Sequence, residues 1–141
     1  MRNILFLLLI IPTLVFSQKK DYNSYDKAVS YFNKGDIEKA KKSIGKCIQK
    51  NVDWEKPYQL LGKIYEEEGD IELAVKNYYR GFEKDNPIDQ LWWQKIGGLY
   101  FENGLYSNAM YHFKRFVAFQ SKEAAFYKKA MKHIQDCMFA I

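Results

Sequence analysis

Hydrophobic and small residues recur along the chain in a helical pattern that repeats after 34 residues and again after 35. The clearest marker is an alanine, at Ala40, Ala74 and Ala109. Four other marks keep a fixed offset from it: a small residue twelve positions before, a tyrosine nine before, a glycine five before and a bulky apolar residue four after. These marks are Ala28, Gly62 and Gly97; Tyr31, Tyr65 and Tyr100; Gly35, Gly69 and Gly104; and Ile44, Tyr78 and Phe113. A repeat of this length holds two helices, and stacked pairs bury the apolar face that each pair leaves uncovered.

The marked positions have physical reasons. Small residues let the two helices of a repeat approach closely. Each glycine falls where the first helix must stop, because glycine adopts the left-handed conformation of a helix C-terminus without steric cost. Asp36 and Asp70 follow the first two glycines and are predicted N-caps of the next helix. The pattern therefore predicts an all-α fold with repeats at about 21–54, 55–88 and 90–123.

The pattern resembles the tetratricopeptide repeat family over roughly residues 21–123. That family opens its first helix with tryptophan or leucine, followed by leucine, glycine and tyrosine. The matching residues are Tyr58, Leu61, Gly62 and Tyr65 in the middle repeat, and Trp93, Ile96, Gly97 and Tyr100 in the third. The departures are Ser24 and Lys27 in the first repeat, Val52, Asn86 and Ser121 at the closing proline, and Gly81 and Phe116 at a late alanine. The resemblance implies a right-handed superhelical solenoid of three antiparallel helix pairs that serves as an interaction scaffold.

A further amphipathic helix is predicted over about 123–140. Its apolar side holds Phe126, Ala130, Ile134, Cys137 and Met138, and its polar side holds Lys128, Lys129, Lys132 and Asp136. A stripe of this width covers the last exposed repeat face. We interpret the segment as a capping helix that keeps this end soluble. The alternative is a separate docking helix.

The first 17 residues have the character of a secretory signal peptide. Arg2 precedes an apolar run over 4–16, which is shorter than the roughly 20 residues that a transmembrane helix needs. Val15 and Ser17 are small enough to precede a cleavage point. We expect cleavage after Ser17 and an exported mature chain, 18–141, that is periplasmic or extracellular and not inserted in the membrane. The alternative is that the segment persists as an uncleaved anchor.

The charge distribution does not favour a nucleic-acid partner. The formal net charge is +5, and Arg2 is the only charged residue of the predicted signal peptide, so cleavage lowers this charge by one. Lysines and carboxylates are interleaved along the chain, as on solvated helix faces. Export also argues against nucleic acid. We expect a protein or peptide partner, and the sequence leaves homo-oligomerisation open.

No motif indicates catalysis or cofactor binding. His112 and His133 are 21 residues apart and fit no metal-ligand spacing, and there is no phosphate-binding loop. We therefore expect a protein that is not an enzyme and has no catalytic residues, metal or cofactor. Cys47 and Cys137 are predicted on distant helices, whereas a disulfide needs Cα atoms within about 7 Å. Both are expected to pack in the core, and an intermolecular bridge through Cys137 stays open.

The resemblance implies a concave groove lined by the first helix of each repeat. The corresponding residues are Tyr22, Tyr25, Val29 and Phe32; Lys56, Gln59, Lys63 and Glu66; Leu91, Gln94, Gly98 and Phe101; and Lys128 and Lys132 from the cap. This set suits an extended peptide with apolar anchors and some acidic residues. Tyr22, Tyr25 and Phe32 have the alternative of packing within the first repeat. Trp92 is turned about 100° from its core neighbour and is expected to be a partly exposed anchor.

Two hypotheses for function remain. In the first, the chain is a non-catalytic module that binds an extended segment of an envelope protein in its groove. In the second, it is a structural subunit of an envelope assembly, or a self-associating scaffold, that uses its convex face and ends. An apolar patch in the groove favours the first hypothesis, and one on the convex face or cap favours the second.

Relatives that bind chaperone tails hold a terminal carboxylate with lysine and asparagine side chains. The corresponding positions here carry Tyr25, Val29, Leu60 and Leu91, and only Lys95 is basic. The resemblance does not extend to this clamp, so binding of an acidic chaperone tail is expected to be weak or absent.

Overall fold

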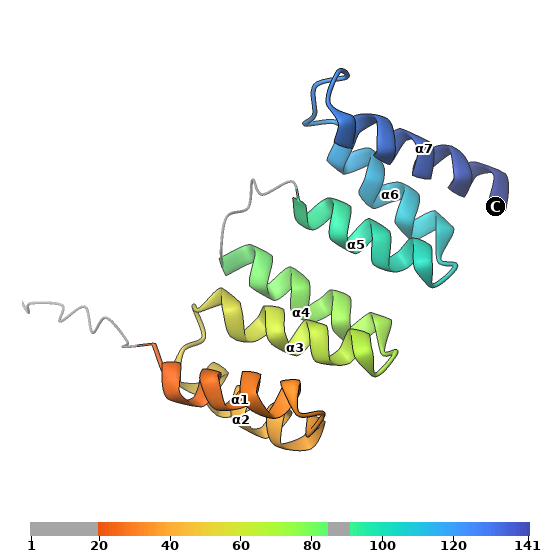
Figure 1. Ribbon diagram of the computed structural model, residues 1–141. Coiled ribbons are helices and arrows are strands. Elements are labelled where there is room, and N and C mark those ends of the chain that lie inside the picture. Colours follow the sequence, from red (N-terminus) through yellow and green to blue (C-terminus); the bar gives the residue numbers. More distant parts are fainter. Residues whose placement is uncertain (1–19, 85–90) are drawn as a thin grey trace, which may run out of the picture.

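A computed structural model of the chain describes residues 20–84 and 91–141 (Figure 1). Every regular element within these residues is an α-helix, which confirms the predicted all-α fold. The helices are α1 (Tyr22–Asn33), α2 (Ile37–Lys50), α3 (Glu55–Glu67), α4 (Ile71–Lys84), α5 (Leu91–Glu102), α6 (Tyr106–Val117) and α7 (Ala125–Ala140). Helices that follow one another in the chain pack side by side, so the molecule is an elongated stack.

The predicted signal peptide, residues 1–17, lies outside the described residues. Its cleavage and the alternative of an anchor therefore stay predictions. Among the helices that the structure does describe, none has the length and apolar character needed to cross a membrane.

Glycine ends the first helix of each pair, as predicted. Gly35, Gly69 and Gly104 have φ angles of +76°, +79° and +72°. The next amide then donates a hydrogen bond back to the tyrosine near the end of the preceding helix, at 2.9 Å in each turn: Asp36 to Tyr31, Asp70 to Tyr65 and Leu105 to Tyr100. This bond satisfies a carbonyl that the helix end would leave unpaired. The repeated tyrosine and glycine therefore mark the same turn three times.

The predicted N-caps are confirmed in the first two pairs. The carboxylate of Asp36 accepts from the amide of Lys39 at 3.2 Å, and that of Asp70 accepts from the amide of Leu73 at 3.0 Å. In the third pair, Leu105 takes this position and provides no side-chain cap. The N-termini of α2 and α4 are thus fixed by side-chain caps, whereas the N-terminus of α6 depends on backbone hydrogen bonds and packing.

Small residues allow close helix approach at the expected positions. A Cβ atom added to Gly62 would lie 2.8 Å from Cδ1 of Tyr78, and one added to Gly97 would lie 3.0 Å from Cδ1 of Phe113. These distances are shorter than ordinary carbon contacts, so an aromatic ring of the second helix occupies the space of the missing side chain. A Cβ atom added to Gly81, at a late alanine position, would similarly lie 3.1 Å from Cγ of Gln59.

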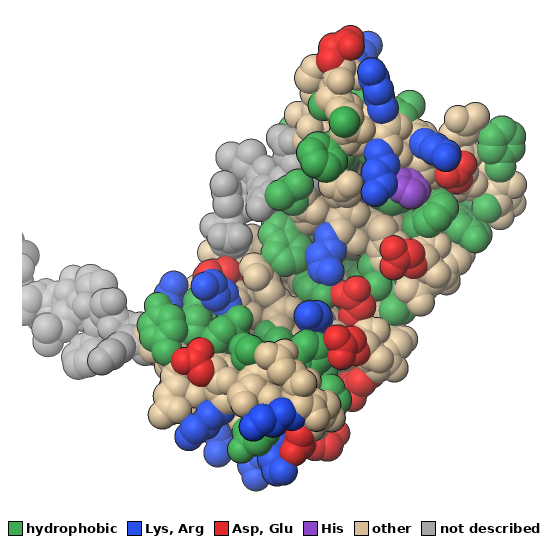
Figure 2. Space-filling model, viewed as in Figure 1, with side chains coloured by type: hydrophobic (Ala, Val, Ile, Leu, Met, Phe, Trp, Pro, Cys, Tyr) green, Lys and Arg blue, Asp and Glu red, His purple; other side chains and the backbone are tan. Residues whose placement is uncertain are grey.

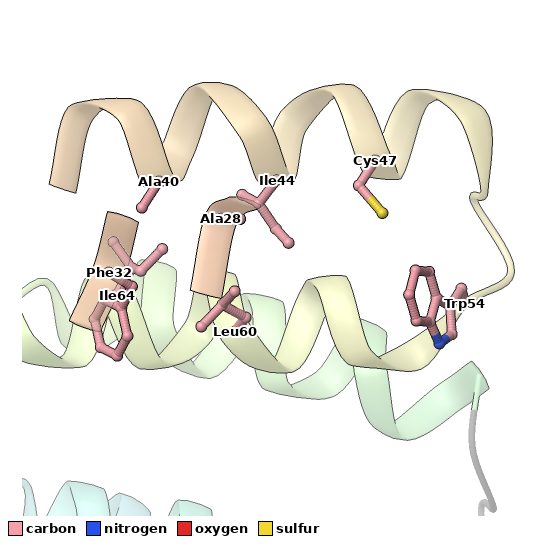
Figure 3. Close-up of a cluster of buried hydrophobic side chains, with 8 residues drawn as sticks. All are labelled: Ala28, Phe32, Ala40, Ile44, Cys47, Trp54, Leu60 and Ile64. Atoms are coloured by element: carbon pink, nitrogen blue, oxygen red, sulfur yellow. The ribbon is translucent and has the colours of Figure 1, made fainter. Parts of the chain in front are cut away.

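The core consists of three buried clusters along the stack. The first joins α1, α2 and α3 through Ala28, Phe32, Ala40, Ile44, Cys47, Trp54, Leu60 and Ile64 (Figure 3). The second joins α4 and α5 through Ala74, Val75, Tyr78, Ile96 and Leu99. The third joins α6 and α7 through Ala109, Phe113, Phe116, Ala130, Ile134 and Cys137. Both cysteines are free and buried, in the first and third clusters respectively.

The predicted apolar side of α7 is only partly buried. Ala130, Ile134 and Cys137 pack against α6, but the side chain of Phe126 is 57% exposed and that of Met138 is 65% exposed. The expectation that all five cover the last repeat is therefore wrong for these two. The physical reason is that, of the helices in the described residues, α7 contacts only α6 and α5, and this contact covers a narrower arc than the apolar stripe occupies.

Candidate functional site

The first helices of the three pairs and α7 line a common face. α1 contacts α3, and α5 contacts α7, in addition to the contacts between successive helices. Figure 2 views the molecule from this side and shows acidic and basic side chains interspersed with apolar ones along its length. We call this surface the groove face, because it is the face that the sequence assigns to the predicted groove.

The groove face contains a hollow of about 410 Å³ between the end of α3, α5 and the middle of α7. We call it the α5–α7 hollow. Its lining includes Glu66, Gln94, Lys95, Phe101, Lys129 and His133. Gly98 also lines it, and a Cβ atom added there would meet nothing within 4 Å. Glycine at this position therefore leaves the surface of α5 open to a ligand.

His133 lies at the α7 side of the hollow between two aromatic rings. It stacks on Phe113 with ring centroids 5.0 Å apart, and its edge meets Phe101 with centroids 4.9 Å apart. Its Nδ1 atom is buried and has no hydrogen-bond partner within the described residues. Because buried polar atoms are usually paired, this nitrogen would gain a hydrogen bond to a bound group if the ring turned to expose it.

The charged groups of the hollow are of two kinds. Lys95 donates to Glu66 at 3.3 Å, and Glu66 also accepts from the hydroxyl of Tyr78. Burial, followed by the bond to Glu66, raises the pKa of Tyr78 above its usual range. Lys129, by contrast, forms no ion pair within the described part of the chain. Glu102 also lines the hollow and likewise forms no ion pair among the described residues, so the hollow offers one unpaired cation and one unpaired carboxylate beside an aromatic floor.

The structure brings five of the predicted groove residues into this hollow: Glu66, Leu91, Gln94, Gly98 and Phe101. Leu91 is exposed, whereas Phe101 is half-buried by its contact with His133. The third repeat therefore supplies most of the recessed surface of the groove face.

The predicted aromatic residues of the first repeat lie elsewhere: Tyr22 and Tyr25 beside Trp54, and Phe32 in the first core cluster. Tyr22 and Tyr25 contact Trp54 with ring centroids 5.0 and 4.9 Å away. Phe32 is 9% exposed and belongs to the first core cluster, with the Lys63 ammonium 5.2 Å from its ring centroid. Phe32 and, in part, Tyr25 follow the packing alternative, whereas Tyr22 contacts Trp54 but stays 55% exposed. Sequence reasoning did not single out Trp54, although an aromatic residue directly before a repeat was a usable signal.

The remaining predicted residues are spread along α3 and α5. Lys56 and Lys63 are exposed, and Gln59 is half-buried against Gly81. Trp92 is partly exposed, in agreement with its expected turn around the helix, and packs on Tyr78 with ring centroids 5.7 Å apart. These side chains do not meet in one pocket, so they would contribute to a long surface and not to a single compact site.

The cap contributes different residues from those predicted. Lys129 and His133 line the α5–α7 hollow, whereas Lys128 and Lys132 line another surface of α7. The prediction was wrong by one residue, because each predicted lysine directly precedes in the chain a residue that lines the hollow. With Ala130, Ile134 and Cys137 turned inward, residues 129 and 133 lie on one flank and 128 and 132 turn outward. The spacing of the small core residues was the signal that could have found this.

His112 belongs to the core and not to the site. It is buried between Trp93 and Tyr100, with ring centroids 5.5 and 5.3 Å away, and meets the hydroxyl of Tyr79 at 3.3 Å. Burial lowers its pKa to about 4, so the ring is neutral at physiological pH. Within residues 20–84 and 91–141, no cluster of His, Cys, Asp and Glu could hold a metal ion.

Comparisons with known proteins agree on the fold. A family model described as the CadC C-terminal domain matches residues 16–113. No curated protein matches the chain. A solved complex of the TPR2B domain of yeast Sti1 with pHsp70 is similar to this chain at 13% identity and a TM-score of 0.64, covering 86% of this chain and 98% of that one.

Two further solved structures have the same architecture. The TPR domain of Arabidopsis OM64 is 15% identical, with a TM-score of 0.61, and the match covers 82% of this chain and 93% of that one. PcrH in complex with the chaperone-binding region of PopD is 16% identical, with a TM-score of 0.62 and coverage of 84% and 90%. These likenesses confirm the predicted tetratricopeptide repeat fold.

Proposed function

The chain belongs to the CadC C-terminal domain family, and from this premise and its tetratricopeptide repeat fold we propose that it is a non-catalytic protein–protein interaction module. It binds an extended peptide segment of an envelope protein along its groove face. The observation that carries this proposal is the α5–α7 hollow, which combines an unpaired lysine, an unpartnered histidine nitrogen and an aromatic floor. An acidic side chain next to an apolar anchor is the peptide chemistry that such a hollow recognises.

Two of the similar structures support this proposal by what they contain. The yeast Sti1 domain is in complex with pHsp70, and PcrH is in complex with a region of PopD. The peptide of our chain need not be a chaperone tail, since Tyr25, Val29 and Leu60 occupy places where such relatives carry clamp residues. We expect an internal segment with an aromatic or aliphatic anchor and one or two carboxylates.

The test fills the hollow without disturbing the fold. Gly98→Leu places a side chain in open space on α5, and Gly45→Leu does the same on α2, outside the hollow. Peptides selected from a random display library on the purified chain are titrated by fluorescence anisotropy. Gly98→Leu and Lys129→Glu are expected to weaken binding by about tenfold or more, which is about 1.4 kcal/mol. Gly45→Leu should leave binding unchanged, and equal binding by Gly98→Leu would remove the hollow as the site.

The place of action is proposed from the N-terminal sequence. Export to the periplasm or the exterior requires that the apolar segment over 4–16 act as a signal and that cleavage occur after Ser17. Mass spectrometry of the protein from fractionated cells of its own host should then find Gln18 as the first residue. A cytoplasmic protein that retains its first 17 residues would contradict export.

A second candidate function is favoured by a specific observation on another surface of the same, C-terminal end of the stack. Most of the large exposed apolar side chains among the described residues lie from Phe119 onward: Phe119, Phe126, Met131, Met138, Phe139 and Ile141. An apolar surface at the cap supports the hypothesis of assembly through an end of the molecule. The groove and the cap are distinct surfaces, so the two functions are compatible.

A further inference from the structure

The outward surface of α7 carries a shallow, open hollow that, among the described residues, α7 alone lines. We call it the α7 outer flank and define it by Lys128, Met131, Lys132, Ile134, Gln135 and Met138. Met131 is 40% exposed, and Ile134 forms the floor because it is turned toward α6. The flank lies on the other side of the helix from Lys129 and His133, so it is separate from the α5–α7 hollow.

The residues of the flank are spaced to receive side chains of another helix. Met131, Ile134, Gln135 and Met138 stand at i, i+3, i+4 and i+7, and Lys128, Met131, Lys132 and Gln135 form the same set one turn earlier. Four residues at this spacing make the hole into which a knob of a facing helix inserts. Every α-helix offers this spacing, but here the positions hold Met131, Ile134 and Met138, which are apolar side chains that the knobs of a facing helix can contact.

The charges of the flank indicate what kind of helix would bind. Lys128 and Lys132 border the apolar hollow, form no ion pair within the described residues, and no acidic side chain lines it. A second copy of the chain docked flank to flank would place four lysines together without a carboxylate. Like charges at an interface disfavour a partner, whereas opposite charges select it.

We infer that the α7 outer flank docks an amphipathic helix of another protein, with apolar knobs bordered by Asp and Glu. α7 then becomes an interior helix of the joint assembly instead of its last layer. This inference is independent of the proposed peptide groove, because it uses none of the residues that line the α5–α7 hollow.

The probe is a pair of synthetic 18-residue helical peptides with the same leucine stripe, one bordered by glutamates and one by lysines. The purified chain is labelled at its methionine methyl groups, of which Met131 and Met138 lie on the flank and Met110 lies on α6. The acidic peptide should shift the NMR signals of Met131 and Met138 and leave that of Met110 in place. Its Kd should be lower than that of the basic peptide by about tenfold or more.

Variants then locate the site and its charge preference. Met138→Glu should abolish binding of the acidic peptide, while Tyr111→Glu, at another exposed position on α6, should not. Lys128→Glu combined with Lys132→Glu should reverse the preference toward the basic peptide. Equal binding of both peptides, or no binding, overturns the inference.

Three further outcomes distinguish the inferred partner from other occupants of the α7 outer flank. Gly98→Leu should leave the acidic peptide bound, and loss of binding would place that peptide in the groove instead. A dimer in sedimentation velocity that Met138→Glu dissociates would identify a second copy as the occupant. Flotation with phosphatidylglycerol vesicles that Met138→Glu abolishes, without peptide binding, would identify a membrane surface. Each of these results contradicts the inferred partner.

Discussion

At the N-terminal end of the described chain, Trp54 is 2% exposed and holds Tyr22 and Tyr25 against it, whereas at the C-terminal end Phe139 is 83% exposed and has no such cover. Each end has an outermost layer that packs on one side only. The first layer buries Phe32 and half-buries Tyr25 and Tyr31, with Tyr22 left 55% exposed, whereas α7 leaves Phe126, Met138 and Phe139 more exposed than that. The comparison teaches that a terminal helix of a solenoid is not by position alone a solubilising cap.

Polar contacts at the two ends differ in the same sense. Asp21 caps α1 through Ser24, pairs with Lys50 at 2.9 Å, and its amide donates to the side chain of Asn51 at 2.5 Å. α7 begins after Ala124, which provides no side-chain cap. The N-terminal end is therefore fastened by a network of side chains, while the C-terminal end is held by the packing of Ala130, Ile134 and Cys137.

The largest expected effect comes from removing the aromatic anchor of the closed end. Trp54→Ala should lower the free energy of unfolding by about 3–5 kcal/mol, because it empties a buried site that Tyr22 and Tyr25 pack upon. Phe139→Ala should change it by about 0.5 kcal/mol or less, since the ring is already in solvent. Urea unfolding measures both. A comparable loss from Phe139→Ala would break the contrast between the ends.

The two cysteines allow one sample to show how readily each terminal layer opens to solvent. Cys47 and Cys137 are both 0% exposed, one under each terminal layer. Native-state alkylation, mapped by mass spectrometry, should modify Cys137 faster by about tenfold, which corresponds to about 1.4 kcal/mol less protection. The reason is that, of the described helices, α7 contacts only α6 and α5, and it lacks a side-chain cap. The same measurement in concentrated urea, where both thiols are accessible, provides the control, and equal native rates would contradict the prediction.

An N-cap added to α7 should bring the stability of the C-terminal end closer to that of the N-terminal end. Ala124→Asp places a carboxylate at the N-cap, where the backbone is extended with φ −64° and ψ 137°. We expect a gain of about 0.5–1 kcal/mol in the free energy of unfolding and slower alkylation of Cys137. Ala124→Leu, which cannot accept a hydrogen bond, should give no gain. If both variants behave alike, capping does not limit the opening of α7.

The sequence was sufficient to predict the repeat but not to predict which residues meet on the surface of the stack. Gly35 and Gly69 could be placed because a left-handed turn requires a glycine, and Gly62 because an aromatic ring needs its space. These are local or pairwise requirements that leave a mark at fixed spacing. The α5–α7 hollow joins Glu66 to Lys129 across three helices, so no spacing encodes it. The direction in which α7 turns depends on which neighbours bury its small residues, and its lysines were misassigned for that reason.

The smallest expected effect concerns acid and again separates the ends. The bonds from Lys50 and Ser24 lower the pKa of Asp21 from 3.8 to about 2. Since the folded state holds this proton less tightly than the unfolded state, the stabilisation is complete above about pH 5 and is lost as the pH falls toward 2. Asp21→Asn keeps an N-cap but cannot titrate or pair with Lys50. Urea unfolding at several pH values should therefore show that the wild type is more stable than Asp21→Asn near pH 6. This difference in the free energy of unfolding should shrink as the pH falls. If the ion pair is the cause, the difference in the free energy of unfolding caused by Asp21→Asn should be smaller at every pH when the chain also carries Lys50→Met. A difference that does not depend on pH would mean that Asp21 acts only as a cap.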